Sequence, residues 1–162
     1  MRQRLVAYHM FKVPERPQGF GYGQLPRDLL LPSKVNATLL VAERRTSIRL
    51  MSDLFDRLGF CDVEATHSGE DALGMLRAKK YGLLLADWQI GAMSGLQLLR
   101  AVKGDEKLRR TPVLIAAANL TCEQVVLARR TGADALILKP FLASALRSKI
   151  EEVTKRQSSR TT

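Results

Sequence analysis

The chain has 162 residues, 46% of them hydrophobic, which is enough to bury one core domain with short tails. Its 26 Lys and Arg residues outnumber 16 Asp and Glu residues, and this formal charge of +10 favours an acidic partner: a protein face, a nucleotide, nucleic acid or an anionic membrane surface. The sequence has two cysteines, which lie outside any metal-ligand spacing, and this argues against a disulfide scaffold and a zinc site. It has no apolar run of membrane-spanning length, which argues against a membrane span. Together these features predict a cytoplasmic protein.

The positive charge is concentrated at the two ends of the chain. Residues 1–36 carry six basic side chains against two acidic ones and hold four of the six prolines, which predicts a basic, Pro- and Gly-rich N-terminal arm. Residues 154–162 add three basic side chains and no acid, which predicts a basic C-terminal tail. Each end has two interpretations, a binding segment for an acidic partner or a solubilising tail.

Between these ends, apolar runs typical of strands alternate with segments of helical periodicity. The first strand is expected over 38–42. The first helix is expected over 46–60, with Thr46 as a cap and Gly59 as the stop. A second strand and helix are expected over 61–66 and 69–80. The third strand, 82–87, ends on a lone acid, Asp87, and the third helix follows over 94–104.

The second half of the chain continues the same alternation. The remaining strands are expected over 112–117 and 133–139, and the remaining helices over 122–132 and 142–153. Five strands alternating with five amphipathic helices predict an α/β domain over 37–153, a parallel sheet with helices on both faces and right-handed crossovers. In such a sheet ligands bind beyond the carboxyl ends of the strands. The side chains expected there are those of Ala42, Glu43, Asp87, Ala117 and Lys139.

Four separated segments, 39–60, 81–99, 111–119 and 131–141, resemble the receiver domain of two-component response regulators. The closest resemblance is to the single-domain chemotaxis type, the CheY-like receivers, and it covers about residues 38–153. It implies the flavodoxin-like (βα)5 fold, a doubly wound parallel sheet with strand order 2-1-3-4-5.

The resemblance implies a phosphorylation site around Asp87, the family's phosphoryl acceptor. Lys139 matches the family's counter-charge for the phosphoryl group. Glu43, Asp87 and the backbone carbonyl of Gln89 match the ligands of a divalent metal, usually Mg²⁺, which prefers oxygen ligands. A carboxylate can attack a phosphohistidine only where its own negative charge and that of the phosphoryl group are offset. The metal and the Lys139 amine would offset these charges. The implied phosphoryl donor is a sensor histidine kinase or a phosphotransfer protein.

Three positions depart from the family pattern and make the predicted site degenerate. Ala42 replaces one of two acids after the first strand, which weakens the expected Mg²⁺ site. Ala117 replaces a Ser or Thr that responds to the phosphoryl group, and Leu136 replaces the aromatic residue that follows its movement. Two interpretations stay open: a divergent regulator phosphorylated on Asp87, and a pseudo-receiver adaptor in which Asp87 and Lys139 form a structural ion pair. Neither predicts an enzyme, beyond self-phosphorylation and dephosphorylation at Asp87.

Two arginine pairs are candidate contacts to a partner. Arg44 and Arg45 precede the first helix. One interpretation is that they bind phosphate or cyclic di-GMP, and the other is that they are simply solvated at the helix start. Arg129 and Arg130 lie in the fourth helix, on the face that docks output partners in the family. They predict an acidic protein target there, such as a flagellar or chemotaxis component, or ordinary surface charge.

Two further residues lie next to predicted strand ends. Trp88 follows Asp87 and would report binding in the cleft by its fluorescence. His67 follows the second strand and is interpreted as a loop residue, not a metal ligand. The sequence contains no nucleophile–histidine set, no Gly-rich phosphate loop and no second helical domain that reads DNA, so neither a metabolic enzyme nor a DNA-binding protein is predicted.

Overall fold

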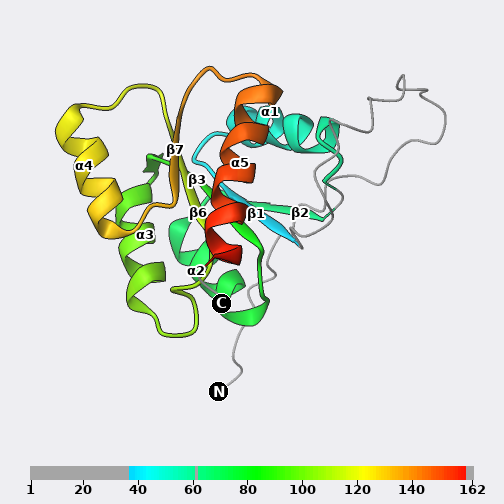
Figure 1. Ribbon diagram of the computed structural model, residues 1–162. Helices are drawn as coiled ribbons and strands as arrows, with labels where there is room; N and C mark the ends of the chain where they lie inside the picture. Colours follow the sequence, from blue (N-terminus) through cyan, green and yellow to red (C-terminus); the bar gives the residue numbers. More distant parts are fainter. Residues whose placement is uncertain (1–36, 61, 160–162) are drawn as a thin grey trace.

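The computed structural model describes residues 37–60 and 62–159 (Figure 1). The predicted arm over 1–36 and the last residues of the predicted tail lie outside the described residues. The described chain forms one five-stranded parallel sheet of order β2-β1-β3-β6-β7 and a separate two-stranded hairpin, β4-β5. With the hairpin left aside, this is the predicted strand order 2-1-3-4-5, and the predicted fold class is confirmed.

Every predicted strand and helix is present. The sheet strands are β1 (Thr38–Val41), β2 (Val63–Thr66), β3 (Leu83–Asp87), β6 (Val113–Ala117) and β7 (Ala135–Leu138). The helices are α1 (Arg45–Arg57), α2 (Gly69–Ala78), α3 (Gly95–Gly104), α4 (Cys122–Thr131) and α5 (Ala143–Ser158). No helix of the described chain has the length and apolar character to cross a membrane.

Two predicted helix ends differ from the structure. Thr46 does not cap α1, because the helix already begins at Arg45 and its N-cap residue, Arg44, makes no side-chain cap hydrogen bond. Helix α5 continues to Ser158, past the boundary expected at 153. The stop at Gly59 agrees with the structure: its φ of 87° is a left-handed conformation that glycine adopts without strain.

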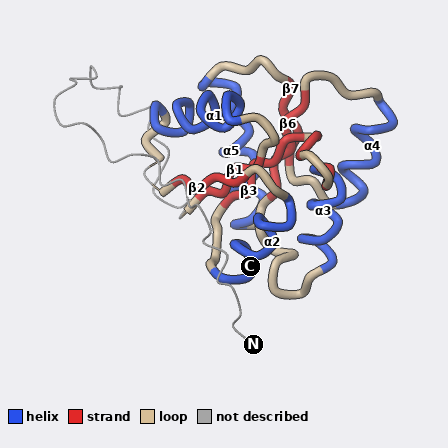
Figure 2. Tube along the Cα trace, turned by 180° about the vertical axis from the view of Figure 1, so that it is seen from behind, coloured by secondary structure: helices blue, strands red, loops and turns tan. Residues whose placement is uncertain are grey.

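Helices cover both faces of the sheet and bury two separate hydrophobic clusters (Figures 1 and 2). Helices α1 and α5 pack on one face, where Phe55 and Leu146 are fully buried. Helices α2, α3 and α4 contribute to the other cluster, which includes Leu98 and Ala128. Every residue of β1, β3 and β6 is buried, which explains why these strands are continuous apolar runs in the sequence.

The hairpin directly after Asp87 was not predicted. It consists of β4 (Gln89–Ile90) and β5 (Met93–Ser94), which pair in antiparallel fashion around a turn with Gly91 at φ 56°. Ser94 then caps α3 through a reciprocal capping box with Gln97. The hairpin and the cap together fix the backbone between Asp87 and the start of α3.

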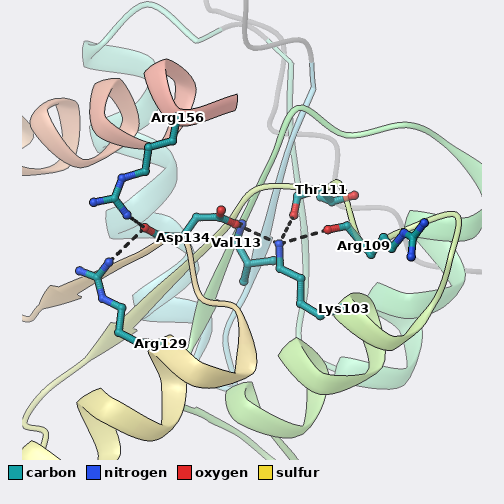
Figure 3. A network of polar contacts seen from close by, with 7 residues as sticks. All are labelled: Lys103, Arg109, Thr111, Val113, Arg129, Asp134 and Arg156. Atoms are coloured by element: carbon teal, nitrogen blue, oxygen red, sulfur yellow. Dashed lines mark hydrogen bonds and ion pairs between the residues drawn. The ribbon is translucent and has the colours of Figure 1, made fainter. Parts of the chain in front are cut away.

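At the amino edge of the sheet, a buried aspartate joins four elements through its carboxylate and its backbone carbonyl (Figure 3). Oδ2 of Asp134 accepts hydrogen bonds from Lys103 Nζ of α3 at 3.0 Å and from the backbone N–H of Val113 in β6 at 2.9 Å. The Asp134 backbone carbonyl accepts from Arg156 of α5 at 3.2 Å and from Arg129 of α4 at 3.5 Å. With its side chain only 4% exposed, Asp134 is a structural anchor at the end of the sheet away from the expected site.

Replacing this anchor should destabilise the fold. Asp134→Asn leaves the mostly buried Lys103 without its counter-charge, and breaking a buried ion pair costs about 3 kcal/mol or more. We expect that loss in the free energy of unfolding measured in urea. The control is Glu151→Gln, which removes a more exposed pair with Arg147 on α5 and should cost about 0.5 kcal/mol or less. Equal losses in the two variants would contradict the anchoring role.

Candidate functional site

Asp87 and Lys139 meet at the carboxyl edge of the sheet. Asp87 is the last residue of β3, and its side chain is 10% exposed. Lys139 directly follows β7, where its backbone N–H donates to the Ala117 carbonyl at 2.7 Å. This places Lys139 Nζ 2.6 Å from Oδ1 of Asp87. The structure therefore brings the predicted acid and amine into direct contact.

The Asp87 carboxyl has unused hydrogen-bonding capacity. Oδ1 is fully buried, and apart from the Lys139 amine no donor of the described chain reaches it. Burial raises the pKa of Asp87 above its usual value, and the hydrogen bond and charge of Lys139 offset this only in part. A buried polar atom left so poorly satisfied is costly in a purely structural role and calls for a functional explanation.

Glu43 lies at the same edge without touching this pair. Strands β1 and β3 pair with Val41 opposite Ala86, so the register brings Ala42 level with Asp87. Ala42 is fully buried and offers only a methyl group. Glu43 follows it, is exposed, and makes no ion pair or side-chain hydrogen bond to any described residue.

A close backbone approach fixes the segment after Asp87. Gly95, the first residue of α3, donates its N–H to the Trp88 carbonyl at 2.8 Å. A Cβ on Gly95 would lie 2.2 Å from the Asp87 carbonyl oxygen, so only glycine fits here. Trp88 is half-buried against the core, and Gln89 is exposed at the start of the hairpin. Sequence analysis missed this role of Gly95, because a glycine before a helical pattern signals only a helix start.

Comparison with known proteins identifies the family. The response regulator receiver domain matches residues 38–151. This chain belongs to the receiver domain family. The chemotaxis protein CheY of Pseudomonas aeruginosa is 36% identical over 118 residues, covering 73% of this chain and 95% of that protein. The chemotaxis protein CheY-3 of Vibrio cholerae is 32% identical over 118 residues, covering 73% and 91%.

Solved structures share the receiver fold. The chemotaxis protein CheY4 of Vibrio cholerae matches with a TM-score of 0.68 and 21% identity, over 74% of this chain and 98% of that one. The receiver domain of a Pseudomonas aeruginosa sensor histidine kinase, solved with a magnesium ion in its active-site cleft, matches with a TM-score of 0.67 and 20% identity, over 74% and 97%. At this identity the likeness shows the fold alone.

The donors at the carboxyl edge of this receiver fit Mg²⁺, although they are few. The part of the chain that the structure describes contains no cluster of three His, Cys, Asp or Glu residues that could hold a metal. Mg²⁺ needs fewer side chains, because it takes one or two carboxylates and keeps several waters. The underused buried oxygen of Asp87, the exposed Glu43 and the Gln89 carbonyl are hard oxygen donors of the required kind.

Ala117 and Leu136, the two other positions predicted to depart from the family pattern, carry apolar side chains. Ala117 ends β6 and is 4% exposed. Leu136, in β7, is half-buried and packs against the cluster on the α2–α3–α4 face. Neither side chain has a group that can donate a hydrogen bond.

The four arginines do not form one site. Arg44 and Arg45 are exposed at the start of α1, at the carboxyl edge, whereas Arg129 and Arg130 are exposed near the end of α4, at the amino edge. Arg129 also donates to the Asp134 carbonyl, as Figure 3 shows. The structure does not bring the two pairs together, so they do not combine into one anion-binding site.

The close approach at Gly95 predicts a specific loss of stability. In Gly95→Ala the new methyl overlaps the Asp87 carbonyl, and such overpacking costs about 1–3 kcal/mol in the free energy of unfolding. Gly104→Ala is the control: it ends the same helix, and an added Cβ there meets nothing within 4 Å. We expect this control to be as stable as wild type or more so. Urea unfolding measures both, and equal stabilities would rule out the tight contact.

Asp87 should also give stability a characteristic pH dependence. Because its folded-state pKa is raised, the native state holds this proton more tightly than the unfolded state does. Wild type should therefore lose stability relative to Asp87→Asn as pH rises from about 4 to about 7. Urea unfolding at several pH values measures this difference.

Glu152 offers a control of opposite sign. Its hydrogen bond from Lys149 lowers its pKa, against a smaller opposing effect of burial. Glu152→Gln should therefore lose stability relative to wild type over the same pH rise. A difference between wild type and Asp87→Asn that does not change with pH would contradict the assignment for Asp87.

Proposed function

We propose that this receiver domain is a response regulator that takes a phosphoryl group on Asp87 and signals through protein contacts. The observation that carries the proposal is the buried Asp87 oxygen whose one close polar neighbour among the described residues is the Lys139 amine, at 2.6 Å. The chemotaxis relatives support a link to chemotaxis or motility within two-component signalling. The phosphoryl donor is a sensor histidine kinase or a phosphotransfer protein.

Phosphoryl transfer requires a nucleophile and a means of offsetting charge. A carboxylate oxygen of Asp87 attacks the phosphorus of a phosphohistidine; the new P–O bond forms, the P–N bond breaks, and the departing imidazole takes up a proton. Burial makes this carboxylate more basic than an exposed one and hence a better nucleophile. The Lys139 ammonium then turns from the carboxylate to the phosphoryl oxygens. Asp87, Glu43 and the Gln89 carbonyl would hold Mg²⁺, which would supply further neutralisation of charge.

The absence of a second acid in the segment after β1 lowers the expected Mg²⁺ affinity. A methyl group at Ala42 can neither bind a cation nor orient one of its waters. We therefore expect phosphorylation to require more Mg²⁺ here than in receivers with two acids at this point.

The output surface that we propose lies on α4 and the β7–α5 connection. Large apolar side chains are exposed there: Val125, Val126, Leu127, Leu138 and Leu142. Arg130 adds positive charge on α4, whereas Arg147 on α5 is neutralised by Glu151. An apolar surface with a basic rim suits an acidic protein target, such as a flagellar or chemotaxis component.

A phosphorylation-independent adaptor is the second candidate function. It is favoured by the apolar side chains of Ala117 and Leu136, which give a phosphoryl group no hydroxyl to attract and no aromatic ring to move. In this alternative, Asp87 and Lys139 form a structural ion pair. Partner binding would then be the same for wild type and Asp87→Asn.

Phosphorylation of Asp87 can be measured directly. Incubation with acetyl phosphate and Mg²⁺ should add one phosphoryl group to wild type and none to Asp87→Asn, as read by intact-protein mass spectrometry. Asp53→Asn changes an exposed carboxylate on α1 and is the matched control, expected to gain the group as wild type does. Chelation of Mg²⁺ should abolish the gain.

A wild-type chain that gains no mass under conditions that label an ordinary receiver would overturn the acceptor role and favour the adaptor. Equal labelling of Asp87→Asn would place the phosphoryl group elsewhere and would also refute the proposal.

A further inference from the structure

His67 links two loops at the carboxyl edge of the sheet. Its Nδ1 lies 3.0 Å from the backbone carbonyl oxygen of Ala42, and a carbonyl oxygen only accepts, so Nδ1 carries the hydrogen and donates. The Ala42 N–H donates in turn to the Thr66 carbonyl at 3.3 Å. The two backbone polar groups of Ala42 are therefore held by the last residue of β2 and by the loop that joins β2 to α2.

This hydrogen bond adds a side-chain contact to the segment between β1 and α1, where the Arg44 carbonyl accepts from the Ile48 N–H at 3.1 Å. Ala42 immediately precedes Glu43, and α1 begins without a side-chain cap, whereas Ser68, Ser94 and Thr121 cap the next three helices. Among the described residues, no side chain other than His67 donates to the backbone between Ala42 and Arg44.

The same loop also contacts the segment after Asp87. Gly69, two residues after His67, begins α2 against Met93 of the β4–β5 hairpin. A Cβ on Gly69 would lie 2.6 Å from Met93 Sδ. The β2–α2 loop and the first residue of α2 therefore contact the segment that leads to Glu43 on one side and the hairpin that carries Gln89 on the other.

We propose that His67 is a positioning residue for the Mg²⁺ and phosphoryl site. Through its hydrogen bond to Ala42, it sets the direction in which the chain leaves β1 and hence the orientation of Glu43. The inference rests on the proposed function. Because position 42 carries no acid, Glu43 is the one side-chain ligand expected from this segment. Its orientation therefore affects Mg²⁺ affinity more than it would in a receiver with two acids at this point. Residues that orient a ligand typically change metal affinity by about 10–100-fold.

Two substitutions separate the hydrogen bond from the bulk of the ring. His67→Asn keeps a donor nitrogen at the same number of bonds from the backbone as Nδ1, whereas His67→Leu fills similar space without a donor. Titration of each full-length variant with Mg²⁺ alone, followed by calorimetry and by Trp88 fluorescence, gives the dissociation constant. We expect about a tenfold weaker affinity in His67→Leu and an affinity close to wild type in His67→Asn.

Ser68→Ala is the matched control from the same loop. It removes the cap of α2, whose Ser68 Oγ accepts from the Asp71 N–H at 3.2 Å, so it should lower the thermal midpoint without changing Mg²⁺ affinity. If His67 contributed only to stability, His67→Leu would likewise have a lower thermal midpoint and an unchanged Mg²⁺ affinity.

The inference is overturned if His67→Leu binds Mg²⁺ as wild type does, if His67→Asn is as impaired as His67→Leu, or if wild type binds no Mg²⁺. Phosphorylation of Asp87, read by mass on the same preparations, tests the proposed function separately. A chain that binds Mg²⁺ in a His67-dependent way but gains no phosphoryl group would retain this inference and refute only the proposed function.

Discussion

A carboxylate at the end of a fully buried strand must be compensated, and the contact of Lys139 with Asp87 is the compensation that the structure provides. Asp134, at the opposite edge of the sheet, is buried to a similar degree but receives two hydrogen bonds on one oxygen alone. Asp87 has a single amine beside a buried oxygen that is otherwise without donors. Folding would favour saturating both acids. The lighter pairing of Asp87 is the feature on which its proposed role as phosphoryl acceptor rests.

The surroundings of Asp87 combine a rigid side with an apolar side. On the rigid side, the capping box of α3 and the contact between Gly95 and the Asp87 carbonyl fix the backbone that follows the acid. On the apolar side, Ala117 and Leu136 give the site no polar group that could respond to a new anion. In the function proposed above, such a site would bind a phosphoryl group through Asp87 and Lys139, and its signal would reach a partner by another route. The acylphosphate itself would be the simplest such route.

The sequence was sufficient to predict the sheet and the meeting of Asp87 with Lys139 at one edge. Strands β1, β3 and β6 are buried along their whole length, so their apolar runs were unambiguous, and parallel order placed Asp87 and Lys139 at one edge. The β4–β5 hairpin was missed because strands of two residues have no periodicity to detect. The end of α5 was placed at the last apolar residue, Val153, whereas the helix continues on polar residues such as Arg156, which pairs with Glu152 at 2.8 Å.

The missed role of His67 has a different origin. A hydrogen bond between residues 25 positions apart leaves no local pattern, and a lone histidine after a strand is ordinarily a loop residue. Its importance follows from what its neighbours lack: α1 has no side-chain cap, and position 42 has no carboxylate. Precise placement of a ligand requires support from residues whose own geometry is fixed. Asp87 has that support from its own strand, hairpin and helix. The segment that carries Glu43 has backbone hydrogen bonds at Ala42 and Arg44 and, among the side chains of the described residues, only the imidazole of His67.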